Sequence, residues 1–85
     1  MRRSIDDQPI TAEDLPPGTD DATPVSWAVA VCDDYGDATC RVILTVEDLG
    51  RPGAGIAAHL AGADARRLRA ALRDALREIG EDTGV

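Results

Sequence analysis

The sequence is poor in aromatic residues, lysine, cysteine and long apolar runs. Its 85 residues include no Phe, one Trp and one Tyr, and all nine basic residues are arginine. No apolar stretch approaches the ~20 residues that a membrane-spanning helix needs. Two cysteines are too few to define a disulfide scaffold. The composition therefore predicts one small soluble domain at most.

The charge balance is strongly acidic. There are 16 acidic residues against 9 basic ones, which gives a net charge of -7. Such a chain repels nucleic acid and anionic membranes at long range, which excludes a general, non-specific DNA coat. Residues 1–7 turn acidic where a secretory signal turns apolar. We therefore expect a cytoplasmic protein in which Cys32 and Cys40 stay reduced.

The first 24 residues differ in composition from the remainder. They hold four of the five prolines and six acidic side chains, with few large apolar residues. Such a segment buries too little surface to offset the entropy lost on ordering. The sequence predicts a disordered acidic tail over residues 1–24 and a small folded domain over residues 25–85.

Two strands with alternating apolar residues are predicted next. Residues 25–32 carry large apolar side chains at every odd position, and residues 39–49 carry them mainly at even positions. The segment 33–37, rich in Asp and Gly, predicts the turn between them. The two apolar faces coincide only if the loop has an even number of residues, such as 34–37.

This register also separates the two thiols. It sets Val31 opposite Cys40 and directs Cys32 to the other side of the sheet, so an intramolecular disulfide is not expected. Residues 55–60 predict a short third strand, although the same residues could begin the following helix.

Residues 63–79 predict an amphipathic helix that Gly80 ends. The fold class is therefore α+β: a two- or three-stranded antiparallel β-meander followed by one C-terminal amphipathic helix. One face of this helix is apolar, with Ala65, Leu68, Leu72, Ala75, Leu76 and Ile79.

A second face of the same helix carries an arginine stripe, formed by Arg66, Arg69, Arg73 and Arg77. The simplest interpretation is a solvated face whose arginines pair with Asp74 and Glu78. The same stripe is also a candidate surface for an acidic protein partner, or for nucleic acid.

Residues 60–72, Leu-Ala-Gly-Ala-Asp-Ala-Arg-Arg-Leu-Arg-Ala-Ala-Leu, resemble a segment of small actinobacterial proteins. In those proteins a strand ending in Leu leads into Ser/Thr-Pro-x-Glu-Ala-Arg-x-Leu and an Ala-Leu helix. Here Ala61 and Gly62 stand in place of the capping hydroxyl and the proline. The resemblance implies a strand followed by a helix, and it implies no activity.

Metal, cofactor and catalytic sites are not expected. Cys32, Cys40 and His59 offer three zinc ligands, but the register sends the two thiols to opposite faces. The segment 53–58 matches Gly-x-Gly-x-x-Ala, yet no second parallel strand follows its helix, as a dinucleotide site requires.

The sheet face opposite the helix is expected to lack a covering layer, and it carries Ala28, Ala30, Cys32 and Ile43. Because the core is also small, we expect a homodimer that buries this face, with Ile43 in the contact. The function predicted is that of a non-enzymatic interaction or regulatory protein that binds a protein partner. The alternative is a nucleic-acid-binding regulator that uses the arginine stripe.

Overall fold

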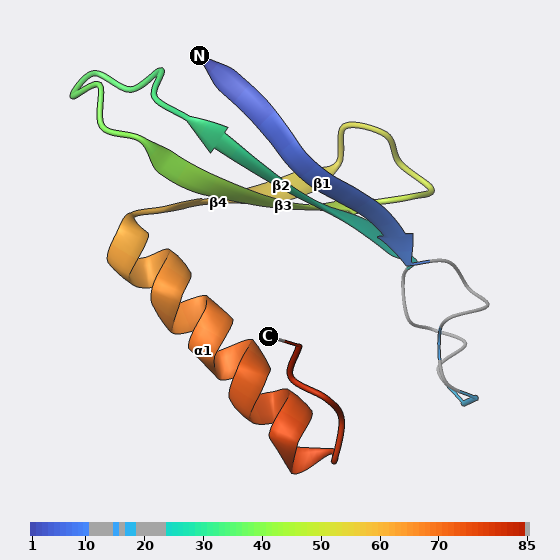
Figure 1. Ribbon diagram of the computed structural model, residues 1–85. Helices are drawn as coiled ribbons and strands as arrows, with labels where there is room; N and C mark the ends of the chain where they lie inside the picture. The colour runs from blue at the N-terminus through green and yellow to red at the C-terminus, as the bar shows by residue number, and fades with distance from the viewer. Residues whose placement is uncertain (11–14, 16, 19–23, 85) are drawn as a thin grey trace.

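A computed structural model describes residues 1–10, 15, 17–18 and 24–84 and contains one antiparallel sheet and one helix (Figure 1). The sheet order follows the chain, so each strand pairs with the next, and the α+β class with one C-terminal helix is confirmed. The elements are β1 (Arg2–Ile10), β2 (Val25–Cys32), β3 (Arg41–Asp48), β4 (Gly55–Leu60) and α1 (Gly62–Glu78).

The sheet has four strands rather than the two or three predicted, because β1 forms where disorder was expected. β1 pairs with β2 from Arg2 opposite Cys32 to Ile10 opposite Val25, with a bulge between Ser4 and Asp6. Composition is a poor guide here, since a strand at a sheet edge gains backbone hydrogen bonds without burying large side chains. The remainder of the predicted tail includes residues 11–14, 16 and 19–23, which lie outside the described residues.

β2 and β3 pair in the predicted parity. Trp27 lies opposite Val46 and Val31 opposite Val42, so the two apolar faces coincide. The connecting loop spans residues 33–40; it is twice as long as expected but still even-numbered. A one-residue change in the loop length would turn the apolar side chains of one strand to the other face. The alternation of apolar residues therefore requires an even-numbered loop.

The longer loop changes the surroundings of the thiols. Cys32 pairs with Arg41, and Cys40 precedes β3, so the expected pairing of Val31 with Cys40 is wrong. Cys32 is half-buried and Cys40 is exposed, and both are free thiols.

β4 is a strand, which decides between the two alternatives for residues 55–60. It pairs one-to-one with β3 from Gly55 opposite Glu47 to Leu60 opposite Val42. Gly55 is required by close packing, because a Cβ atom there would lie 2.9 Å from the carbonyl oxygen of Val46.

α1 ends as the sequence predicts. Gly80 has a φ of +77°, a conformation that a residue with a Cβ atom adopts at a cost. Its N–H donates to the carbonyl of Arg77 (3.0 Å), and the N–H of Glu81 donates to that of Leu76 (2.9 Å). These two bonds form a Schellman motif, which satisfies carbonyl groups that the helix leaves free.

The sheet has two distinct faces. The helix-side face, which α1 approaches, carries Trp27, Val29, Val31, Val42, Leu44, Val46, Ile56, Ala58 and Leu60. The loop-side face carries Ala28, Ala30, Cys32, Arg41, Ile43, Thr45, Ala57 and His59.

The best-buried side chains lie on the loop-side face. Ile43 is 3% exposed and Ala30 is 6% exposed, and no other hydrophobic residue of the described chain is as buried. The expectation that Ile43 lies uncovered is therefore wrong. Ile43 is on a central strand, between Ala30 and His59 in the register, and the Tyr35 ring meets His59 on the same face.

Candidate functional site

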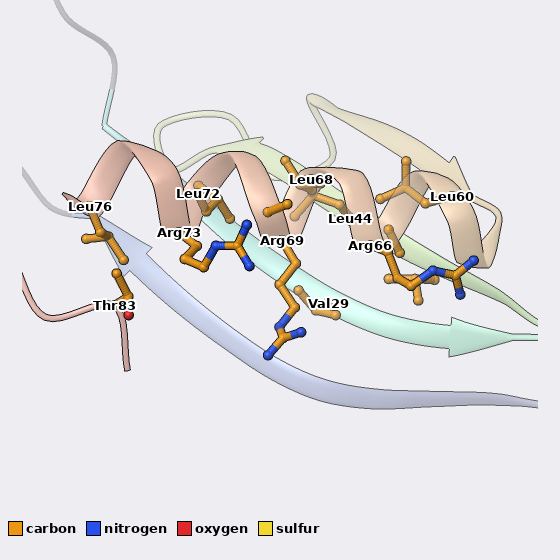
Figure 2. A pocket seen from close by; sticks show the side chains of 13 residues that line it. Val29, Leu44, Leu60, Arg66, Leu68, Arg69, Leu72, Arg73, Leu76 and Thr83 are labelled. Atoms are coloured by element: carbon orange, nitrogen blue, oxygen red, sulfur yellow. The ribbon is translucent and has the colours of Figure 1, made fainter. Parts of the chain in front are cut away.

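An open apolar cleft lies between α1 and the helix-side face of the sheet (Figure 2). It encloses about 600 Å³. The sheet contributes Val29, Val42, Leu44 and Leu60, and the helix contributes Ala65, Leu68, Ala70, Leu72 and Leu76. The predicted apolar stripe of the helix thus faces the sheet, but it does not close against it.

The exposure of the helix shows how open the cleft is. No residue of α1 is buried, and Leu72 is 59% exposed although it lines the cleft. On the sheet, Ile56 of β4 is 81% exposed. An amphipathic helix ordinarily gains its stability by burying its apolar stripe, so this packing is incomplete.

The C-terminal segment bounds one end of the cleft. After Gly80 reverses the chain, residues 81–84 return alongside α1, and Thr83 lies against the cleft near Leu76 (Figures 1 and 2). The chain reversal at Gly80 therefore places Thr83 at the cleft.

Three of the four predicted arginines line the cleft. Arg66, Arg69 and Arg73 extend from one side of the helix (Figure 2). Arg77 is not among the lining residues. Asp74 lies beside the stripe, with its Oδ1 atom 3.3 Å from Nε of Arg73 and 3.9 Å from Nη1 of Arg77. The last predicted partner-binding residue, Ile43, lies on the opposite face of the sheet and is buried.

A second cluster lies on the loop-side face. The Tyr35 hydroxyl and Nδ1 of His59 are 2.8 Å apart, and the two rings meet edge to face with their centroids 5.6 Å apart. The Arg41 guanidinium lies over the Tyr35 ring, 4.6 Å from its centroid. Tyr35 comes from the β2–β3 loop, so this contact joins the loop to β3 and β4.

Asp37 anchors this cluster. Its carboxylate accepts hydrogen bonds from Nη1 (3.0 Å) and Nη2 (2.8 Å) of Arg41 and from the backbone N–H of Thr39 (3.1 Å). These bonds, chiefly those from Arg41, hold the pKa of the Asp37 carboxyl well below its usual range. The same pair raises the pKa of Arg41.

Sequence reasoning missed this cluster because it treated residues 33–37 as a turn. Tyr35 is one of only two aromatic residues in the chain, and His59 is the only histidine. That rarity was the available signal, since aromatic residues contribute large contact areas and are seldom placed in solvated turns.

The described residues offer little for metal or phosphate chemistry. They contain no group of three or more His, Cys, Asp or Glu side chains arranged to hold a metal ion. Gly53 lies in the β3–β4 turn with a φ of +89°, and Gly55 begins a strand. A helix N-terminus, which a phosphate-binding glycine loop requires, does not follow them directly.

No protein-family model, curated protein sequence or solved structure matches the chain. Within the described ranges, no helix combines the length and the hydropathy needed to cross a membrane. The function is therefore inferred from the geometry of the cleft and its arginines.

Proposed function

We propose that this chain is a non-enzymatic interaction protein whose cleft binds an apolar segment of a partner protein bearing acidic side chains. The observation that carries this proposal is the open cleft of about 600 Å³ between α1 and the sheet. An exposed apolar surface with a polar rim is typical of protein-binding sites. A segment inserted there would complete the burial that α1 lacks.

The arginines support an acidic partner. Arg66, Arg69 and Arg73 border an aliphatic floor, so a ligand gains apolar burial and ion pairs together. Nucleic acid fits less well, because its phosphates need a broad basic field and the chain carries a net charge of -7. No feature of the cleft favours nucleic acid over a protein.

Self-association remains part of the proposal, but its expected contact changes. The sequence predicts a homodimer from the small core and from the uncovered sheet face that carries Ile43, and that side chain is 3% exposed. The large exposed apolar residues near the cleft instead include Ile56 and Leu72. A contact between copies therefore involves the helix side or the sheet edge rather than Ile43.

Selection from a random peptide library tests the proposed ligand chemistry. The purified protein should enrich peptides that combine Leu, Ile or Phe with Asp or Glu, and salt should weaken their binding. Changing Arg66, Arg69 and Arg73 together to Gln should weaken an enriched peptide about tenfold. This follows from three exposed ion pairs worth ~0.5 kcal/mol each.

A matched control comes from the same helix. Arg67 and Arg77 do not line the cleft, so Arg67→Gln combined with Arg77→Gln should leave the affinity within about twofold. A further variant, Leu68→Ser, should weaken binding without changing the preference for acids. Enrichment of no peptide, or equal losses in the two arginine variants, would contradict the proposal.

A further inference from the structure

The two edges of the sheet are built differently. The outer strand β1 carries Arg2, Arg3, Asp6 and Asp7, has a proline at position 9, and contains the bulge between Ser4 and Asp6. Charges, proline and bulges are the features by which sheet edges avoid pairing with other chains. The β1 edge is therefore protected against self-association.

The opposite edge lacks all of these features. β4 has the sequence Gly-Ile-Ala-Ala-His-Leu, without a formal charge or proline, and its register with β3 is regular throughout. Five of its six residues are exposed, and no described strand covers its outer side. Its outward backbone N–H and C=O groups therefore form a template for another strand.

A second copy of this chain is the occupant that this edge fits. The chain as a whole carries a net charge of -7, which opposes contact between copies over most of the surface. The β4 strand is neutral, so two copies meet there without direct charge repulsion. A strand that pairs with its own copy also forms a closed interface, which leaves no free edge of that kind.

We propose that β4 pairs antiparallel with β4 of a second copy, with Ala58 at the two-fold axis. The axis then runs perpendicular to the sheet, which keeps the two helix-side faces on the same side. Ile56, which is 81% exposed, comes to lie opposite Leu60 of the second copy. The two four-stranded sheets become one continuous sheet.

This arrangement covers exposed apolar surface that the single chain leaves open. The helix α1 begins at Gly62, two residues after Leu60, so the start of each helix lies close to Ile56 of the other copy. The proposal deepens the self-association part of the proposed function and rests on it. Leu60 belongs to both surfaces, whereas Ala58, the position changed in the test, does not line the cleft.

Charges of opposite sign at position 58 test both the pairing of the β4 edges and the position of the two-fold axis. The wild type should have twice the 8.9 kDa protomer mass in light scattering after size exclusion. Ala58→Lys alone and Ala58→Glu alone should both be monomeric, because each places two like charges opposite one another. An equal mixture of the two variants should restore the dimer, whereas Ala58→Gln should remain dimeric by itself.

Disulfide trapping decides the case if a charged variant fails to fold. In a background of Cys32→Ser and Cys40→Ser, Ala58→Cys should form a covalent dimer on mild oxidation. Ser4→Cys, on the protected β1 edge, should not. A monomeric wild type at about 100 μM, or dimeric charged variants, would overturn the proposal.

The two proposals fail in distinguishable ways. If Ala58→Lys dissociates the dimer but the protein enriches no peptide, the pairing of β4 edges is supported and the peptide ligand of the cleft is contradicted. Peptide binding by a monomeric wild type would do the reverse.

Discussion

The two faces of the sheet differ in a way that their composition does not suggest. The loop-side face carries mainly small or polar side chains, yet it holds Ala30 and Ile43, the two best-buried hydrophobic residues described. The helix-side face carries most of the large aliphatic residues, yet Val46 is 40% exposed and Ile56 is 81% exposed. The apolar residues therefore identify the face that α1 approaches, but α1 does not bury them fully.

Geometry explains the difference. On the loop-side face, Tyr35 reaches from the β2–β3 loop to His59, the register neighbour of Ile43. On the helix-side face, one helix must cover four strands from a single connection at Leu60. A layer that is too narrow leaves apolar surface for another chain to bury.

The largest effect on the free energy of unfolding is expected from a comparison of one residue from each face. Ile43→Ala should lower the free energy of unfolding by about 2–5 kcal/mol, because it removes buried methyl groups and leaves a cavity. Leu72→Ala should cost less than about 1 kcal/mol, since that side chain is 59% exposed and loses little burial. Urea denaturation followed by far-UV circular dichroism measures both.

Equal losses for these two variants would show that the cleft closes in solution. If Ile43→Ala does not fold, Ile43→Val gives the same ranking with a smaller loss of about 1 kcal/mol.

A smaller effect is expected from the hydroxyl of Tyr35. Tyr35→Phe keeps the ring under the Arg41 guanidinium but removes the hydrogen bond to His59. The loss should be about 1 kcal/mol, the usual net contribution of such a bond. A double-mutant cycle with His59→Ala isolates the interaction. A coupling energy near zero would mean that the loop does not rest on this face.

The smallest effect is a pH dependence of stability that depends on Asp37. Its pKa is lowered in the folded state from an ordinary value of 3.8, so protonation favours the unfolded chain. The stabilisation is therefore fully present above about pH 4 and is lost as the pH falls through the lowered pKa. The difference in urea midpoint between wild type and Asp37→Asn should shrink below pH 3.8.

Arg41→Gln provides the control for this measurement, because Arg41 is the main cause of the lowered pKa. In that background Asp37→Asn should change the acid dependence much less. An unchanged effect would assign the pH dependence to other carboxylates.

The arginine stripe shows how far sequence reasoning extends into the site. Periodicity alone located Arg66, Arg69 and Arg73 on one side of the helix, and the structure brings all three to the cleft. It also included Arg77, which does not line the cleft although its neighbour Leu76 does. Periodicity fixes the angle of a residue around the helix axis, but which side chains border the cleft depends on how the helix is placed against the sheet.

Elements whose patterns are local are predictable from the sequence. These are β2, the parity of the β2–β3 pairing, the helix with its apolar stripe, and the end of that helix at Gly80. Each follows from spacing along the chain or from the backbone freedom of glycine.

Three features depend on the tertiary structure. β1 forms by pairing a charged segment with the free edge of β2, Ile43 is buried on the face that the β2–β3 loop reaches through Tyr35, and the cleft is open because α1 does not pack closely against the sheet. All three depend on contacts between residues distant in sequence, and their free energy comes from pairing and layering that no local pattern encodes.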